Sequence, residues 1–273
     1  VQLFRPWDNF ARMNDSAERL CLPQIDAAFA QEALETLIRL DESWVPSLPG
    51  TSLYIRPFEL GADPFLGLHT VHHSQFGIIL SPSGSYYAEG INPVKIMIET
   101  RDVRAVRGGT GYAKCGGNYA ASSRAGMYAE KKGYTQVLWL DGVERKYVEE
   151  VGAMNVMFMI DHKVVTPALL GSVLPGVTRR SCIQLLKDWG YEVEERQLSA
   201  EEIFTALAEG RLQEAWGCGT AAVVSPIGEL SFHDKAYTIN DFKIGPVTQR
   251  LYDELTGIQY GRLPDTHGWT RVL

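Results

Sequence analysis

The sequence predicts a mixed α/β protein with two domains, because helical and strand-like segments alternate along the chain and one loop-rich stretch divides them. The 273 residues are 45% hydrophobic and 22% charged, which is enough to bury a substantial core. The stretch SPSGSYYAEGINP is rich in Ser, Gly and Pro. We therefore expect a small α/β domain at 1–85, a linker at 86–93 and a larger domain at 94–273.

The first part combines helices with short strands. Apolar residues recur at helical spacing behind Asp8 and Asn9, which are good N-cap residues. The opening VQLFRPW is typical of a strand and a turn with no preceding element, so we expect sequence to be missing before it. The expected elements are helices at 8–20 and 25–40 and strands at 51–60, 75–82 and 93–100.

The second part has its own alternation of helices and strands. Apolar runs such as TQVLWLD and NVMFMID indicate buried strands, and no internal repeat or low-complexity segment is present. The expected elements are helices near 119–132, 178–189, 200–209 and 245–256 and strands at 135–141, 155–161 and 221–226.

Composition favours small-molecule partners over nucleic acid or membrane. The formal net charge is −7, whereas general nucleic-acid binding depends on clustered Lys and Arg. No stretch approaches the roughly 20 uninterrupted apolar residues of a membrane span, and the start lacks the sections of a signal peptide. We expect a cytosolic or organelle-matrix protein.

Neither the cysteines nor the histidines form a metal-binding pattern in the sequence. The 4 cysteines are widely spaced without a CxxC pair, so reduced thiols are expected. His69, His72 and His73 lie in a loop that we expect to be exposed, and no nearby cysteine or acidic cluster completes a ligand set. The sequence therefore predicts no metal site.

The densest glycine cluster surrounds a single lysine, Lys114, in GGTGYAKCGGNYAAS. Glycine lets the backbone approach a ligand, and desolvation among small residues lowers the pKa of a lysine and frees the neutral amine that Schiff-base chemistry requires. A surface loop with a solvated lysine is the alternative. Neither glycine fingerprint for dinucleotides or triphosphates is present.

Two further segments suit a phosphate or a carboxylate. In VLPGVTRRS, Val177 and Thr178 open a helix, whose first amides and positive dipole end attract an anion. In WGCGTAAVVSP, Thr220, Ala221 and Ala222 precede a buried strand and are placed to offer backbone amides to an oxyanion. Each segment is also compatible with an ordinary turn.

The acidic pair Glu149 and Glu150 directly precedes VGAMNVMFMI. Because side chains alternate along a strand, we expect one carboxylate to point inward and its neighbour outward. An inward carboxylate can partner a protonated ring nitrogen, and a solvent-facing pair at a strand edge is the alternative.

These segments together resemble one family. GGTGYAKCGGNYAAS, EEVGAMN, LPGVTR and GCGTAAVVSP resemble, in that order, the branched-chain aminotransferases of the class IV, or fold-type IV, pyridoxal-phosphate family. FRPWDNFARM, RLCLP, TSLYIRPF, QVLWLDGVE and IQYG fit the same family, so the resemblance runs almost from end to end. It implies a smaller N-terminal α/β domain, a larger C-terminal α/β pseudo-barrel, pyridoxal 5'-phosphate in the cleft between them, and a homodimer.

The resemblance also implies roles around the cofactor. Lys114 matches the Schiff-base lysine, which later carries the proton, and Tyr119 matches the tyrosine near the cofactor's phenolic oxygen. Glu150 matches the carboxylate that keeps the pyridine nitrogen protonated. The residues implied at the phosphate are Arg12, Val177, Thr178 and Thr220.

The implied substrate pocket accepts an apolar side chain and a carboxylate. Tyr54 and Arg56 match the pair that meets substrate carboxylates, and Tyr86 matches a residue of the apolar wall. Ala221 and Ala222 would offer amides to the α-carboxylate. The implied reaction is a reversible ping-pong transfer of the amino group from L-leucine, L-isoleucine or L-valine to 2-oxoglutarate, which gives the 2-oxo acid and L-glutamate.

The sequence departs from the family pattern at three points. The upstream F-E-G-x-K motif lies outside it, Ala153 replaces a hydroxyl residue of some members, and Ala222 and Ser225 replace the redox CxxC of the mammalian enzymes. The alternatives are a D-amino-acid aminotransferase, an aminodeoxychorismate lyase or a non-catalytic binding protein with this fold. The sequence does not rank leucine, isoleucine and valine, since one methylene is worth only roughly 1–3 kcal/mol.

Overall fold

The computed structural model describes residues 1–84, 91–233 and 235–273, which form two compact units. The first unit comprises Val1–Ala88 and Ile258–Leu273, and the second comprises Glu89–Gly257. This division differs from the expected 1–85 and 94–273 at the C-terminus. The last residues belong to the first unit, because the C-terminal strand pairs with the N-terminal one. Tyr86 and the greater part of the expected linker 86–93 lie outside the described residues.

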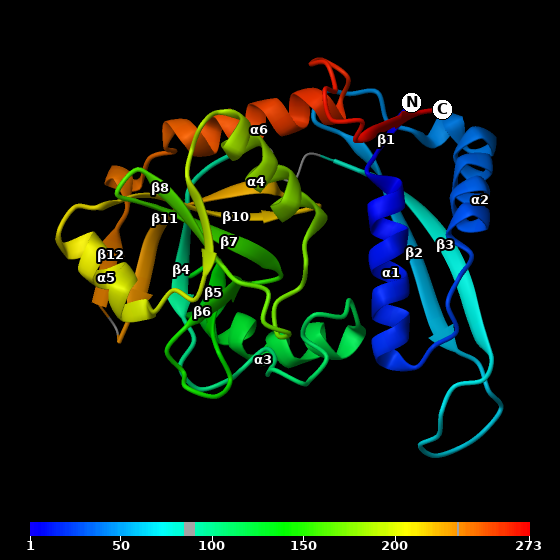
Figure 1. The fold of residues 1–273 in the computed structure, drawn as a ribbon, viewed down its shortest axis with the longest axis horizontal. Helices are drawn as coiled ribbons and strands as arrows, with labels where there is room; N and C mark the ends of the chain where they lie inside the picture. Colours follow the sequence, from blue (N-terminus) through cyan, green and yellow to red (C-terminus); the bar gives the residue numbers. More distant parts are fainter. Residues whose placement is uncertain (85–90, 234) are drawn as a thin grey trace. The chain divides into compact units, whose positions relative to one another are not determined.

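Two helices and a long hairpin build the first unit. Figure 1 shows the helices α1 and α2 beside the strands β2 and β3, with the two chain ends next to each other. Phe10, Leu34 and Ile38 form its buried core, against which the inner face of the hairpin packs. The elements are β1 (Gln2–Phe4), α1 (Pro6–Leu20), α2 (Ala27–Leu40), η1 (Glu42–Trp44), β2 (Ser52–Gly61), β3 (Ser74–Ser83) and β13 (Thr270–Val272).

An ion pair ties α2 to β13 in this unit. Arg271 Nε lies 3.0 Å from Glu35 Oε1, and Arg39 on α2 adds a second cation at 3.3 Å. The hydrogen bond from Arg271, followed by one from Gln31, lowers the pKa of Glu35 to about 2. The C-terminal strand is therefore held to the N-terminal unit by charge as well as by strand pairing.

A closed ring of strands is the centre of the second unit. The strands pair in the order β10-β11-β4-β5-β6-β7, and β7 pairs back to β10. Leu138, Val156, Phe158 and Leu230 are fully buried in the ring core. The ring consists of β4 (Val94–Ile98), β5 (Gln136–Leu140), β6 (Val148–Val151), β7 (Met154–Ile160), β10 (Leu212–Gly219) and β11 (Val223–Phe232). The predicted α/β fold class with a pseudo-barrel is confirmed.

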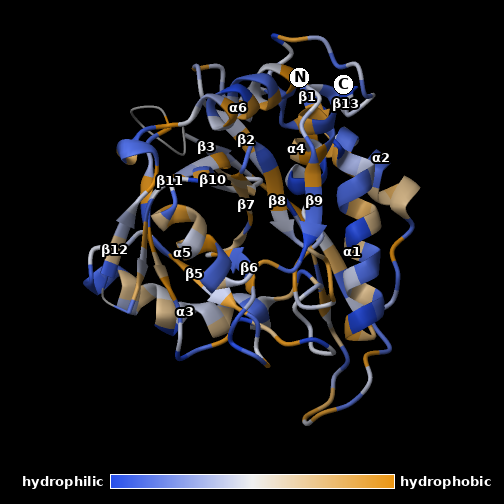
Figure 2. Cartoon of the chain, turned by 60° about the vertical axis from the view of Figure 1, so that its left-hand side comes forward, coloured by the Kyte–Doolittle hydropathy of each residue, from blue (hydrophilic) through white to orange (hydrophobic). Residues whose placement is uncertain are grey.

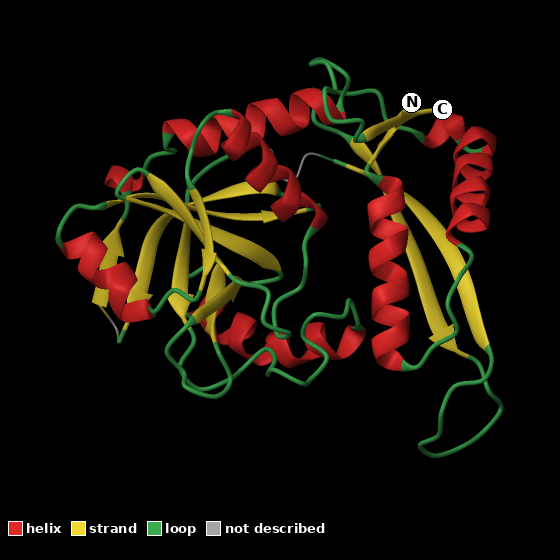
Figure 3. Cartoon of the chain, in the orientation of Figure 1, coloured by secondary structure: helices red, strands yellow, loops and turns green. Residues whose placement is uncertain are grey.

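Helices and further strands surround this ring. Figure 3 shows α3, α4 and α5 outside the barrel strands. Helix α3 packs through Ala125 and Ala129 against Val137 and Trp139 of β5 and its neighbours. The additional elements are α3 (Gly116–Lys131), β8 (Lys163–Pro167), α4 (Val177–Asp188), β9 (Val193–Arg196), α5 (Ala200–Ala208), β12 (Lys235–Thr238), η2 (Asn240–Phe242) and α6 (Pro246–Gln259).

Most expected elements are present, and the strands that were not expected include β8, β9, β10 and β12. Of these, β10 belongs to the closed ring. Its sequence LQEAWGCG mixes glycine, cysteine and polar residues, so it lacks the β-branched run that indicates a strand. The strand forms because it pairs with β7 on one side and β11 on the other. Within the described part of the chain, no helix combines the length and the hydropathy that a membrane crossing requires.

Candidate active site

Lys114 lies on the glycine-rich loop that leads into α3. Its Nζ donates a hydrogen bond of 2.6 Å to the Tyr119 hydroxyl, in the first turns of the helix. The loop is held by the buried Asn118, whose Nδ2 donates to the carbonyl oxygens of Thr110 and Ala113 at 2.9 and 2.8 Å. The structure therefore brings the predicted lysine and tyrosine together on an ordered loop.

The expectation that small residues desolvate Lys114 is wrong for this chain. The lysine side chain is exposed. A Cβ added at Gly116 or Gly117 would meet nothing within 4 Å, so these glycines adjoin open space. Glycine has no side chain that could cover a neighbouring lysine.

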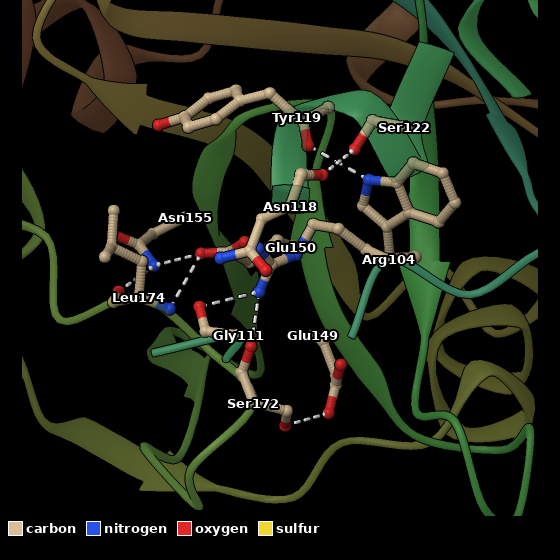
Figure 4. A network of polar contacts seen from close by, with 12 residues as sticks. Arg104, Gly111, Asn118, Tyr119, Ser122, Glu149, Glu150, Asn155, Ser172 and Leu174 are labelled. Atoms are coloured by element: carbon tan, nitrogen blue, oxygen red, sulfur yellow. Dashed lines mark hydrogen bonds and ion pairs between the residues drawn. The ribbon is translucent and has the colours of Figure 1, made fainter. Parts of the chain in front are cut away.

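Glu150 on β6 is a buried carboxylate held from several sides. It is 3% exposed, and Arg104 Nε forms an ion pair with its Oε2 at 2.7 Å. The Leu174 amide and the Asn155 Nδ2 each donate to its Oε1 at 3.1 Å, as Figure 4 shows. Burial raises the pKa of Glu150 to about 7, against the opposing charge of Arg104. These partners therefore fix the orientation of the carboxyl group, and its charge changes near neutral pH.

The carboxylate that was expected to point outward does not reach solvent, because Glu149 and Glu150 are both buried, at 6% and 3% exposure. β6 lies within the closed sheet, where both of its faces are covered. The two side chains still take different partners, since Ser172 Oγ donates to Glu149. Burial also raises the pKa of Glu149.

Arg104 is the site residue that sequence reasoning missed. Its guanidinium is buried at 8% exposure and donates to the carbonyl oxygens of Gly111, at 3.2 Å, and Ser172. It therefore connects Glu150 to the loop that carries Lys114. In the sequence RDVRAVRGG three arginines look alike, so no residue type or spacing distinguishes the buried one.

Val177 and Thr178 open α4, as predicted. Gly176 is the N-cap residue, and no side chain caps this end of the helix, whose first amides and dipole favour an anion. Asn155 Nδ2 also donates to the Leu174 carbonyl at 2.9 Å, and a Cβ on Gly176 would collide with Asn155 Oδ1. The residue that orients Glu150 thus also fixes the entry to α4.

Thr220, Ala221 and Ala222 form the turn between β10 and β11, which pair antiparallel. Thr220 and Ala221 are exposed and Ala222 is buried. Across the sheet, Glu150 is opposite Asn155, which in turn is opposite Cys218. Strand pairing therefore places this turn just beyond the level of Glu150.

Three predicted residues belong to the first unit. Tyr54 and Arg56 lie on β2, where Arg56 Nη2 donates to the Tyr54 hydroxyl at 3.0 Å. Arg12 lies on α1 and donates to Asn9 Oδ1 at 3.1 Å. The structure brings Tyr54 and Arg56 together, and the roles of all three at a ligand stay predictions.

A pocket of the second unit is lined by residues of the Lys114 loop, of α3 and of β6. Tyr119 and Glu150 both line it, and the charge of Lys114 acts on the Glu150 carboxyl by lowering its pKa. Ala153 lies in its wall at the position where the sequence departs from the family pattern. The lining residues are Arg104, Gly111, Ala113, Asn118, Tyr119, Ser122, Glu150, Gly152, Ala153 and Leu174.

A tyrosine and a buried carboxylate that line one pocket, with a lysine hydrogen-bonded to the tyrosine, indicate a class of enzyme. The family described as Amino-transferase class IV matches residues 2–230 of the chain. The chain belongs to this family.

Its relatives within the family are branched-chain aminotransferases. Branched-chain-amino-acid aminotransferase 2 of Bacillus subtilis (strain 168) is 53% identical over 270 residues, which cover 99% of this chain and 74% of the relative. The branched-chain-amino-acid aminotransferase of Mycolicibacterium smegmatis is 45% identical over 275 residues, covering 99% and 75%.

Solved structures give the same result. The crystal structure of the Escherichia coli branched-chain amino acid aminotransferase aligns with a TM-score of 0.83 at 28% identity, covering 99% of this chain and 84% of that one. The T.th. branched-chain amino acid aminotransferase complexed with N-(5'-phosphopyridoxyl)-L-glutamate aligns with a TM-score of 0.82 at 26% identity, covering 99% and 83%.

Proposed function

We propose that the chain is a pyridoxal-phosphate-dependent branched-chain amino acid aminotransferase. It transfers the amino group of L-leucine, L-isoleucine or L-valine to 2-oxoglutarate, reversibly. The observation that carries the proposal is the Lys114–Tyr119 hydrogen bond next to a pocket whose wall includes the buried Glu150. Relatives that are about half identical in sequence are named for this activity.

The residues of the second unit fit the chemical groups of pyridoxal phosphate. An aldehyde requires an amine, and Lys114 Nζ is exposed and hydrogen-bonded to Tyr119. A pyridine nitrogen stays protonated beside a carboxylate, and Glu150 is a buried carboxylate whose pKa burial raises, so a cation beside it is favourable. A phosphate requires donors, which the start of α4 at Val177 and Thr178 provides.

When bound, pyridoxal phosphate supplies a ring that accepts electrons from the substrate's reacting carbon. Lys114 Nζ would hold the cofactor and then carry the proton that leaves Cα of the amino acid. The Tyr119 hydroxyl orients that amine through the 2.6 Å hydrogen bond. Glu150, whose anionic form Arg104 favours, would stabilise a positive charge on the ring nitrogen.

Two groups of residues are proposed to bind the rest of the ligands. Arg12 and Thr220 join the start of α4 at the phosphate, where a guanidinium binds a dianion well. Tyr54 and Arg56 receive substrate carboxylates, supported by their 3.0 Å hydrogen bond, which fixes the guanidinium beside the phenol. Ala221 and Ala222 offer backbone amides to the α-carboxylate. The family resemblance further supports a homodimer.

The test uses the purified full-length protein with added pyridoxal phosphate. Lys114→Ala should abolish the cofactor's visible absorbance band and transamination, because no other amine replaces Nζ. Lys131→Ala, at the exposed end of α3, is the matched control and should keep both. Borohydride should fix the cofactor to Lys114, which peptide mass spectrometry identifies.

The substrate assay compares initial rates with L-leucine, L-isoleucine and L-valine and with D-alanine and aminodeoxychorismate. Branched-chain L-amino acids should react fastest with 2-oxoglutarate. Absence of the absorbance band in the wild-type protein refutes the cofactor role of Lys114. A higher rate with D-alanine refutes the substrate class and leaves the cofactor role standing.

A further inference from the structure

The loop between β2 and β3 gathers potential metal ligands that are separate from the proposed active-site residues. We propose that Asp63, His69 and His72 bind a divalent transition-metal ion, Zn²⁺ above all. One ligand atom from each residue lies within 4.8 Å of the other two. The sequence argument against a metal rested on the lack of an acidic partner, and the folded loop supplies Asp63.

Asp63 is fixed in place by the histidine segment itself. Its Oδ2 accepts the His72 amide at 2.7 Å, and its Oδ1 accepts the His73 amide at 3.1 Å and His73 Nδ1 at 2.9 Å. The side chain is only 1% exposed, because its own loop encloses it. These contacts hold the carboxylate in one orientation beside the histidines.

One hydrogen bond also sets the ring tautomer of a proposed ligand, His69. His69 Nδ1 lies 2.9 Å from the Thr70 carbonyl oxygen, which only accepts, so the proton is on Nδ1 and Nε2 keeps its lone pair. His73 donates from Nδ1 to Asp63 in the same way. Carbonyl and carboxylate contacts of this kind orient the ligands of protein metal sites.

The ligand types and their spacing indicate which ion fits. Two imidazoles and one carboxylate suit Zn²⁺ and its neighbours in the transition series, whereas Mg²⁺ and Ca²⁺ prefer oxygen ligands. Tetrahedral Zn²⁺ with bonds of about 2.0–2.1 Å needs ligand atoms roughly 3.3 Å apart. The ligand atoms are within 4.8 Å of one another, and His69 and His72 are exposed, so small movements of their side chains would be enough to reach this spacing. Water would take the fourth position.

Metal binding would close the loop across its base. Asp63 follows the end of β2, whereas His69 and His72 precede the start of β3. Between them lie Phe65 and Leu66, which are strongly exposed, and Figure 2 shows hydrophobic colour at the tip of this loop. The ion would therefore restrain a segment that presents apolar side chains to its surroundings.

The test measures Zn²⁺ binding to the tag-free, metal-stripped, cofactor-loaded protein by calorimetry and elemental analysis. We expect one Zn²⁺ per chain, with binding lost in His72→Gln and in Asp63→Asn. His73→Gln should weaken binding about 10- to 100-fold, since it removes one of the three contacts that orient Asp63 and no metal ligand. His162→Gln, an exposed histidine of the second unit, is the matched control and should bind like wild type.

Three results overturn the proposal. They are uptake of clearly less than one ion per chain by the wild-type protein, unchanged affinity in His72→Gln, and an equal loss in His162→Gln, which would indicate scattered surface binding. Co²⁺ provides a separate readout, because four-coordinate Co²⁺ gives intense visible bands and octahedral Co²⁺ weak ones. Weak bands in the wild-type protein also contradict the site. Circular dichroism of the metal-free variants shows whether each is folded.

Discussion

The buried pair of Arg104 and Glu150 gives the sharpest prediction about the second unit. Arg104→Met puts a shorter, uncharged, unbranched side chain in this place and removes the positive charge from the carboxylate 2.7 Å away. The side chains of both residues are almost fully buried, at 6% and 4% exposure. Removing one partner of a buried ion pair costs about 3–5 kcal/mol. The free energy of unfolding should fall by that order, part of it from the lost bonds to Gly111 and Ser172.

The loss should also depend on pH, because Glu150 can escape its uncompensated charge by taking up a proton. The pKa of Glu150 is about 7 with Arg104 present and rises further without it. A carboxyl whose folded pKa lies above its unfolded value of 4.5 makes the fold less stable as pH rises between the two. In the wild-type protein this loss of stability is complete near pH 7. In the Arg104→Met variant it continues to grow as the pH rises further. The difference in the free energy of unfolding between wild type and variant should therefore widen above pH 7, by up to about 1.4 kcal/mol per pH unit.

Denaturant unfolding without added cofactor, at about pH 6 and about pH 8.5, measures this gap. Arg211→Met is the control, since Arg211 pairs with Asp161 at the surface and should cost at most about 1 kcal/mol at either pH. In a Glu150→Gln background the pH-dependent part should shrink, and Glu149 would account for what remains. A gap that is equal at both pH values would refute the claim that burial of Glu150 controls its ionisation.

Two further changes test the packing and the charge of the fold. Gly176→Ala should destabilise the protein by about 1–3 kcal/mol, because the new methyl group displaces Asn155. Gly126→Ala is the control: the methyl group has open space in α3, and stability should rise by up to about 1 kcal/mol. Equal unfolding midpoints of the two variants would contradict this. Glu35→Gln should remove stability that the wild type has above about pH 4.5 and loses as pH falls towards 2, because Arg271 lowers the pKa of Glu35. Unfolding curves over that pH range should converge at the acidic end, and parallel curves would contradict the assignment.

Local patterns were enough for the helices and for the key motifs. Helical spacing of apolar residues predicts α2 and α4 closely, since amphipathic period and capping are properties of neighbouring residues. The run around Lys114 likewise places the lysine and Tyr119 five positions apart, at the entry to a helix. Their hydrogen bond follows from local geometry.

Contacts between distant segments were beyond the reach of these patterns. β10 is a strand only because β7 and β11 flank it, and both glutamates of β6 are buried because the sheet closes on itself. Alternation along a strand predicts an exposed face only where one face meets solvent. The error about Glu149 therefore came from the closed topology and not from the strand assignment.

The sequence by itself determined the chemical type of this protein: a lysine in a glycine-rich run, a carboxylate before a buried strand and an anion-binding helix start, all in family order. Only the tertiary structure decided which arginine meets Glu150 and which acid meets the loop histidines. The physical reason is that residue type and spacing encode local conformation. A pairing such as Arg104 with Glu150 depends instead on how the sheet and its loops close around a buried charge.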